Sequence, residues 1–381
     1  MRNINTTIRR QLFLSTVWFI STLGFVELSA QPDRSIFDLL STDPSAGIEM
    51  AKPVILRLPV DSIYAKTQNK QQAVISFTDD NTGREYRRPL HVEVRGKFRR
   101  HLCTFPPLKL NFSKKQLKAD GLSKHDKLKL VTPCFDDDVD AQALILKEYL
   151  AYKLYEQLSP LAFRTQLLEI TYRDIHGQHP DRTVLAFVLE DTDEMAERLG
   201  GVELENGRGL APDRFDRRAE TTQALFSYLI GNLDWNLSMA HNLKMVELTD
   251  GTIVPVPYDF DFSGLVAAPY VRLNSNIGQE YAGQRIYLGF DCSDYLLQEV
   301  YAHFELKRKD LLKTVRGFTI LPGHHRFPAA EYITGFYSEF RRILRLQHHQ
   351  GMAETLYQLI RAEQRGIVPA GGKAMYYGVS K

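Results

Sequence analysis

The chain has 381 residues, of which 44% are hydrophobic and 25% are charged. This balance is typical of a folded globular protein and excludes a disordered or collagen-like chain. Lysine and arginine together number 48 against 46 acidic residues, which gives a formal net charge of +2. Because this net charge is small and no basic stripe is present, nucleic acid is not expected as a partner.

The first thirty residues have the pattern of a secretory signal peptide. Arg2, Arg9 and Arg10 precede the apolar run 12–26, and residues 28–30 (LSA) end the segment. The apolar run is shorter than a membrane-spanning helix requires, so no stable membrane span is expected after cleavage. A retained membrane anchor is the alternative. We therefore expect an exported protein of the periplasm, the cell envelope or the extracellular space.

Cysteine and histidine give little sign of a metal site. The three cysteines, Cys103, Cys134 and Cys292, lack metal-ligand spacing, which disfavours zinc. In an exported chain Cys103 and Cys134 could form a disulfide, but three buried free thiols explain the sequence equally well. The histidine pairs at 324–325 and 348–349 match no metalloprotease pattern, and solvated side chains are expected there.

The first half of the chain has the pattern of a sheet. Residues 31–52 are polar with proline and glycine, which indicates a linker. Short runs rich in valine, isoleucine and leucine predict strands of a mostly antiparallel sheet at 53–60, 73–78, 90–96, 106–112 and 127–132. Residues 140–158 predict a helix with one face on this sheet and Asp140 as its N-cap. Two more strands are expected at 167–172 and 184–190.

The second half is predicted to be mainly helical, with a strand-loop-strand insert at 231–264 and a loose tail at 366–381. Helices are expected at 193–199, 215–230, 295–312, 329–346 and 352–362. The sequence thus predicts an α+β fold with a sheet-rich part at 53–190 and a helical part at 191–365.

The insert carries the densest group of unusual polar residues. Asp234 follows an apolar helix, Asn242 begins a strand, and Asp259 ends the next strand, so a hairpin should bring them together. Phosphoryl transfer from a nucleotide requires one carboxylate that orients the attacking hydroxyl, and an asparagine and a second carboxylate that hold a hard cation. Asp261 lies on the opposite face of an extended strand, so it is the second choice as metal ligand. Each residue taken singly could instead be a turn or capping residue.

These motifs together resemble the spore coat protein CotH kinase-like family. The resemblance rests on GN-x-D, HN, a strand and P-x-x-x-D in the insert, and on VEVRGKFRR and FPPLKLNF upstream, over residues 53–264. It implies a two-lobed atypical kinase-like fold with a sheet-rich N-lobe and a mainly helical C-lobe. It also implies that Asp234 is the catalytic carboxylate, that Asn242 and Asp259 bind Mg²⁺ or Mn²⁺, and that Lys109 contacts the phosphates of ATP.

The same resemblance suggests further cofactor-binding residues. Glu148 on the first long helix would orient Lys109, and Arg95 and Gly96 would form a turn over the phosphates. Glu190 would lie near the base or ribose, although it could equally be a linker charge. Trp235 stands where family members usually carry arginine. The interval from Asp234 to Asn242 is longer than in the protein-kinase loop, so either this loop bulges or Asn236 replaces Asn242 as ligand.

Two classes of function follow. The first is metal-dependent transfer of a phosphoryl group from a nucleotide to a hydroxyl of a secreted protein or another acceptor. The second is a non-catalytic, kinase-like binding or cell-envelope structural module. A hydrolase with paired carboxylates is less favoured, because no second acid pair stands at comparable positions.

Overall fold

The computed structural model describes residues 34–349, apart from 44, 46 and 136–138, together with residues 356–364. The described residues form one compact unit. The predicted signal peptide at 1–30 and the predicted loose tail at 366–381 lie outside the described residues.

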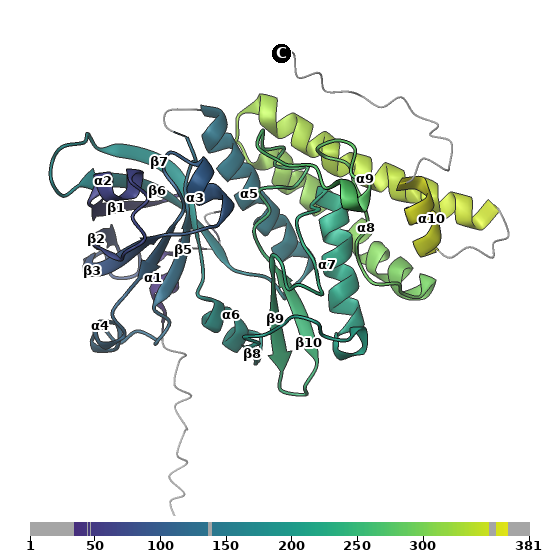
Figure 1. Ribbon diagram of the computed structural model, residues 1–381, viewed down its shortest axis with the longest axis horizontal. Helices are drawn as coiled ribbons and strands as arrows, with labels where there is room; N and C mark the ends of the chain where they lie inside the picture. Colours follow the sequence, from purple (N-terminus) through teal and green to yellow (C-terminus); the bar gives the residue numbers. More distant parts are fainter. Residues whose placement is uncertain (1–33, 44, 46, 136–138, 350–355, 365–381) are drawn as a thin grey trace, which may run out of the picture. The chain divides into compact units, whose positions relative to one another are not determined.

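Seven strands close into a barrel in the order β1-β2-β3-β4-β5-β7-β6 (Figure 1). Neighbouring strands are antiparallel except β1 and β6, which run parallel and pair Lys52 with Leu168 through Leu58 with Asp174. Alternate side chains fill the interior: Leu108 and Leu110 face inward, and Lys109 between them faces outward. The strands are β1 (Lys52–Leu58), β2 (Gln71–Thr78), β3 (Glu85–Val94), β4 (Leu108–Asn111), β5 (Lys127–Val131), β6 (Thr165–Asp174) and β7 (Arg182–Leu189).

The closed barrel corrects the expected fold class. The two-lobed kinase-like arrangement, with a sheet-rich lobe and a helical lobe, is wrong, because the sheet has no open edge and returns on itself where β1 meets β6. Alternation of apolar residues identifies strands one at a time. It carries no signal for a pairing between strands that lie far apart in the sequence.

The short segment before β1 is more ordered than a linker. Residues 31–52, expected as a linker, contain α1 (Ile36–Leu40), which Ser35 and Asp38 cap reciprocally. Ile36 and Phe37 are buried in the core of the barrel. The barrel loops carry three more short helices, α2 (Val60–Tyr64), α3 (Phe98–Leu102) and α4 (Lys114–Ala119).

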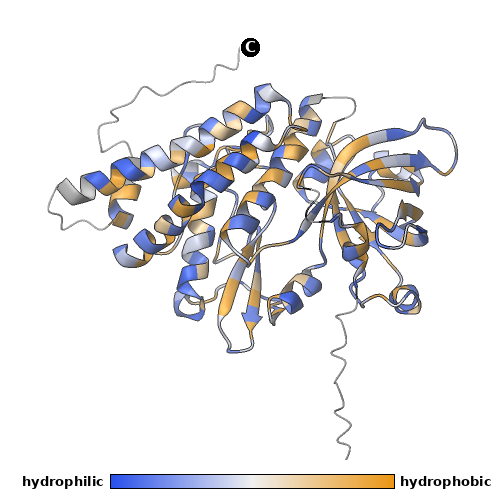
Figure 2. Cartoon of the chain, turned by 180° about the vertical axis from the view of Figure 1, so that it is seen from behind, coloured by the Kyte–Doolittle hydropathy of each residue, from blue (hydrophilic) through white to orange (hydrophobic). Residues whose placement is uncertain are grey.

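The long helix α5 (Val139–Leu158) connects the barrel to the remaining helices. It contacts β7 on one side and α7 and α8 on another, and its apolar residues belong to a second hydrophobic core. Asp140 is not the N-cap, because the helix already includes Val139. Figure 2 shows hydrophobic and hydrophilic residues alternating along this helical part, as expected where one face of each helix packs inward.

The helical part also holds a small sheet of three strands in the order β10-β9-β8. Its hairpin of β9 and β10 lies inside the predicted insert at 231–264. None of the helices in the described part of the chain is long and apolar enough to cross a membrane. The elements are α6 (Thr192–Arg198), β8 (Gly201–Glu203), a 3-10 turn (Pro212–Arg214), α7 (Arg217–Ile230), β9 (Leu243–Leu248), β10 (Ile253–Pro257), a 3-10 turn (Ser275–Ile277), α8 (Asp294–Gly317), α9 (Gly323–His349) and α10 (Leu356–Gln364).

A disulfide joins Cys103 and Cys134, which are 31 residues apart in the sequence. Cys103 follows α3 directly, and Cys134 follows β5, so the bond fixes the end of α3 to the barrel. Cys292 is free and half-buried. Of the two alternatives that the sequence left open, the structure therefore has the disulfide.

We expect the double variant Cys103→Ala/Cys134→Ala to lose about 3–4 kcal/mol of unfolding free energy, because the unfolded chain regains the entropy of a loop of this length. Urea unfolding of the oxidised proteins would measure the loss. Cys292→Ala is the matched control and should unfold near the wild-type midpoint. An unchanged midpoint for the double variant would contradict a stabilising disulfide.

Candidate functional site

The candidate site begins where α7 ends. Gly231 terminates the helix with a φ of +62°, and a Cβ at this position would stand 2.0 Å from the hydroxyl oxygen of Tyr332. Glycine is therefore required both for the left-handed backbone and for the space. The buried Asn232 then accepts a hydrogen bond from the backbone N–H of Asp234 at 3.1 Å. This turn directs Asp234 away from the helix axis.

The long interval between Asp234 and Asn242 is taken up by a bulged loop. Asn236 and His241 pair as a β-bridge, and the side chain of Asn236 accepts a hydrogen bond from the N–H of Met239. The side-chain oxygen of Asn236 therefore already accepts a hydrogen bond within the loop. Asn242 returns to Asp234 and donates to its backbone carbonyl at 2.7 Å and to its carboxylate at 2.9 Å.

The hairpin places Asp259 beside this loop. β9 and β10 pair so that Leu243 faces Pro257, and the N–H of Tyr258 donates to the carbonyl of Asn242 at 3.1 Å. Asp259 has a φ of +64°, and its own N–H donates to the hydroxyl of Tyr152 at 2.8 Å. The hairpin predicted from the sequence thus brings the segments of Asp234, Asn242 and Asp259 together.

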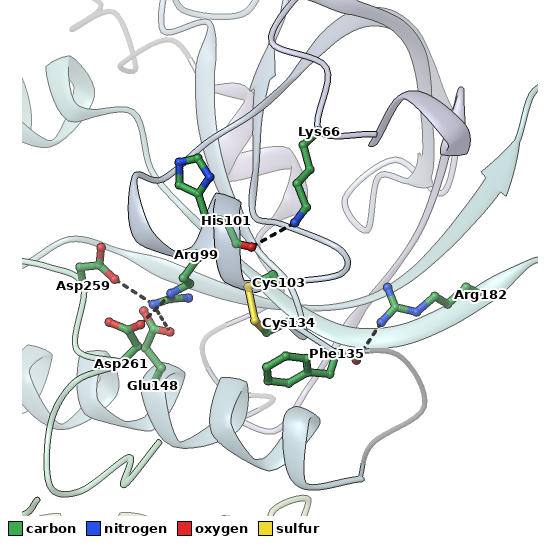
Figure 3. Close-up of a disulfide and its surroundings, with 10 residues drawn as sticks. All are labelled: Lys66, Arg99, His101, Cys103, Cys134, Phe135, Glu148, Arg182, Asp259 and Asp261. Carbon is green, nitrogen blue, oxygen red and sulfur yellow. Dashed lines mark hydrogen bonds and ion pairs between the residues drawn. A yellow bond between two sulfur atoms is a disulfide. The ribbon is translucent and has the colours of Figure 1, made fainter. Parts of the chain in front are cut away.

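The main interaction of Asp259 is with Arg99, which the sequence did not single out (Figure 3). The guanidinium of Arg99, on α3, binds Glu148 at 2.9 Å, Asp259 at 2.8 Å and Asp261 at 2.8 Å. We call these four residues the Arg99 cluster. Asp261 reaches the same arginine as Asp259 because β10 ends at Pro257, so the two acids do not alternate across a strand.

The cluster contains more acid than base, which shifts the pKa values of its carboxyls. Burial raises the pKa of Asp261 well above its usual range, and the charges of Asp259 and Glu148 add to the effect. Burial likewise raises the pKa of Glu148. Burial also acts to raise the pKa of Asp259, but Arg99 and Arg95 outweigh it and hold that pKa below its ordinary value. A further cation near Asp259 would offset the remaining negative charge.

Two cations of the barrel, Arg95 and Lys129, act on Asp259, and Lys244 on β9 acts on Lys129. Lys129 on β5 lies over the rings of Phe163 and Tyr258, with its ammonium 4.9 Å and 4.8 Å from their centres, and donates to the hydroxyl of Thr192 at 3.2 Å. Burial, with a smaller contribution from the charges of Arg95 and Lys244, lowers the pKa of Lys129 to about 7. These three residues form what we call the cationic group.

Lys109 is not a member of the cationic group, because its charge is not among the main ones that shift the pKa of Lys129. It lies on β4, opposite Glu93 on one neighbouring strand and Lys129 on the other. No ion pair of its ammonium is found within the described residues. Glu148, expected to orient Lys109, instead binds Arg99, and that part of the prediction is wrong. Lys109 and Lys129 both occupy the pattern Leu-Lys-Leu, so the sequence alone could not distinguish them.

The other predicted cofactor residues have different outcomes. Arg95 follows β3, and its N–H donates to the carbonyl of Pro107 at 2.9 Å; Gly96 beside it has a φ of +84°. Glu190 is completely buried, and both of its carboxylate oxygens accept hydrogen bonds from Arg164 and Arg198. Glu190 thus joins Arg164 and Arg198, and its expected contact with the base or ribose stays a prediction.

A pocket of about 300 Å³ opens beside Asp234. Phe262 contributes to its wall from the segment after β10, and the residues that line the remainder are largely polar: Arg272, Asn274, Ser275, Asn276 and Gln279. The carboxylate of Asp234 is 38% exposed, and His241 contacts it at 3.0 Å. Asp234 is therefore accessible to a molecule in this pocket.

No protein-family model matches the chain, and the curated proteins contain no match either. The function therefore has to be argued from the chemistry of the site.

We expect Arg99→Met to destabilise the fold by about 3–5 kcal/mol near neutral pH, because it leaves three acids without their buried cation. In the folded variant the buried carboxyls of Glu148, Asp259 and Asp261 would keep protons that the same carboxyls release above pH 4–5 in the unfolded chain. Its stability should therefore fall as the pH rises from about 5 to 8. Arg100→Met, at the neighbouring position in α3, is the matched control. Unfolding midpoints across this pH range would test the difference, and equal midpoints for the two variants would contradict the role of Arg99.

Proposed function

We propose that the protein binds a nucleoside triphosphate such as ATP together with Mg²⁺ or Mn²⁺, and that it transfers the terminal phosphoryl group to a hydroxyl acceptor. The observation that supports this most is the cationic group next to Asp259. Burial is the main cause of the lowered pKa of Lys129, and repulsion by the charges of Arg95 and Lys244 adds to it. An anion with several charges, such as a triphosphate, would relieve this repulsion.

The donor atoms at the hairpin suit a hard divalent cation. Asn242 commits its amide nitrogen to Asp234, which leaves its side-chain oxygen for a cation. Asp259 is 36% exposed and binds Arg99 through only one carboxylate oxygen, Oδ1. Oxygen ligands of this kind fit Mg²⁺ or Mn²⁺. When bound, the cation would neutralise charge on the phosphates.

The accessible carboxylate of Asp234 would orient the acceptor. Its position in the wall of the pocket allows an acceptor hydroxyl to donate a hydrogen bond to it, and His241 and Asn242 hold the carboxylate from two sides. In this arrangement Asp234 would take the hydroxyl proton as the phosphoryl group is transferred. A secreted protein is one acceptor of this chemistry that is compatible with export.

A second function is favoured by the Arg99 cluster itself. Arg99 already binds Asp259 and Asp261, so the acidic residues are partly neutralised without any metal. In a non-catalytic module of the cell envelope, the same ion pairs would hold the barrel and the hairpin in place, and the pocket would bind a ligand without turnover.

We expect Lys129→Met to weaken the binding of ATP with Mg²⁺ or Mn²⁺ at least ~10-fold, because it removes a charge-assisted contact to phosphate. Lys109→Met is the matched control, since it removes the same charge from the adjacent strand, and its affinity should stay within about 2-fold of wild type. Calorimetric titration of the full chain would measure both.

Two further variants separate binding from transfer. Asp259→Asn should remove the metal dependence of ATP binding, and Asp234→Asn should keep binding but lose transfer to an acceptor. If Lys109→Met weakens binding and Lys129→Met does not, the assignment of the phosphate site is wrong. If the wild-type chain binds no nucleotide, the non-catalytic module is the better account.

A further inference from the structure

Three potential metal ligands meet where two helices begin. Asp140 lies in the first turn of α5, and His324 and His325 lie in the first turn of α9. One ligand atom from each residue lies within 4.8 Å of the other two. The residues belong neither to the Arg99 cluster nor to the cationic group, and no sequence pattern predicts that they lie together.

The distances suit a small transition-metal ion. Nε2 of His325 and Oδ1 of Asp140 are already 2.9 Å apart, and the imidazole rings of His324 and His325 have their centres 4.3 Å apart. Zinc binds imidazole nitrogen and carboxylate oxygen at about 2.0–2.2 Å in a tetrahedral arrangement, which separates neighbouring ligand atoms by roughly 3.3 Å. Asp140 and His324 are exposed, so small rotations of their side chains would bring the three atoms to that separation.

The surroundings allow an ion to enter and be retained. The side chain of Asp140 is 71% exposed, whereas that of His325 is 19% exposed, so the group is open on one side and partly enclosed on the other. The nearby charge of Lys147 acts to lower the pKa of His325. The ammonium of Lys147 is itself engaged, because it donates a hydrogen bond to the backbone carbonyl of Val266.

We propose that Asp140, His324 and His325 form a zinc site that ties the start of α5 to the start of α9. The mixed nitrogen and oxygen donors distinguish it from the oxygen-only site for Mg²⁺ at the hairpin. Three protein ligands leave one position for water or for a ligand from another molecule. Because α5 contacts the barrel and α9 packs on α8, the ion would restrain the helical part relative to the barrel.

Calorimetric titration of the full, metal-free chain with Zn²⁺ in the presence of excess Mg²⁺ would test the site. We expect one saturable site in the wild type and at least ~10-fold weaker binding in His325→Ala and in His324→Ala. His91→Ala, an exposed histidine on β3, is the matched control and should bind as the wild type does. Asp259→Asn should also bind Zn²⁺ normally, so the result does not depend on the proposed phosphoryl-transfer site.

A second measurement does not depend on affinity alone. Zn²⁺ should raise the thermal unfolding midpoint of the wild type and of His91→Ala, but not that of His325→Ala, because an ion that binds only the folded site stabilises the folded state. Equal Zn²⁺ affinity in wild type and both His variants would overturn the proposal. So would the absence of saturable binding in the wild type.

Discussion

The guanidinium of Arg99 is the interaction on which the site depends. It comes from α3 on the barrel and binds Glu148 from α5 and both acids of the segment after β10, so three distant parts of the chain meet at one group. Bringing these charges out of water is costly, and only mutual pairing offsets the cost. The position of Asp259 is consequently fixed by α3 and α5 as well as by its own hairpin. Any function of Asp259 therefore depends on the packing of the barrel against the helical part.

Charge is distributed around Asp259 in two opposite sets. The Arg99 cluster has three acids for one base, and the cationic group has three bases, of which Lys244 pairs with Glu203. Neither set is neutral by itself, and the pKa shifts of Asp261 and Lys129 go in the directions that reduce its charge. A ligand that carries both phosphates and a divalent cation would complement both sets at once. This complementarity is the physical basis of the proposed function.

Local patterns predicted the parts of the structure that depend on neighbours in sequence. The strands of the barrel, α5 and the hairpin of β9 and β10 were all foreseen, and with them the approach of Asn242 to Asp234. The closure of the barrel was not, because it depends on β1 and β6 pairing across a long stretch of chain. The same limit explains Lys109 and Lys129, whose local sequences are equivalent and which pair across β4 and β5. Lys129 contacts Thr192, Phe163 and Tyr258, all of which are distant from it in the sequence. Arg99 was missed for a related reason: its partners are distant in sequence, and its own segment reads as an exposed basic run.

The disulfide adds a further condition to the geometry of Arg99. A helix of five residues such as α3 has too few hydrogen bonds to be stable alone, so its place must be set by tertiary contacts. Arg99 provides such a contact within the helix, and the bond from Cys103 to Cys134 provides another directly after it. Loss of the bond would free the end of α3 and weaken the hold of Arg99 on Asp259. Disulfides persist in oxidising compartments. The sequence predicts that residues 1–30 direct export. In an oxidising compartment outside the cytoplasm, the disulfide would persist and would hold α3 where Arg99 binds Asp259.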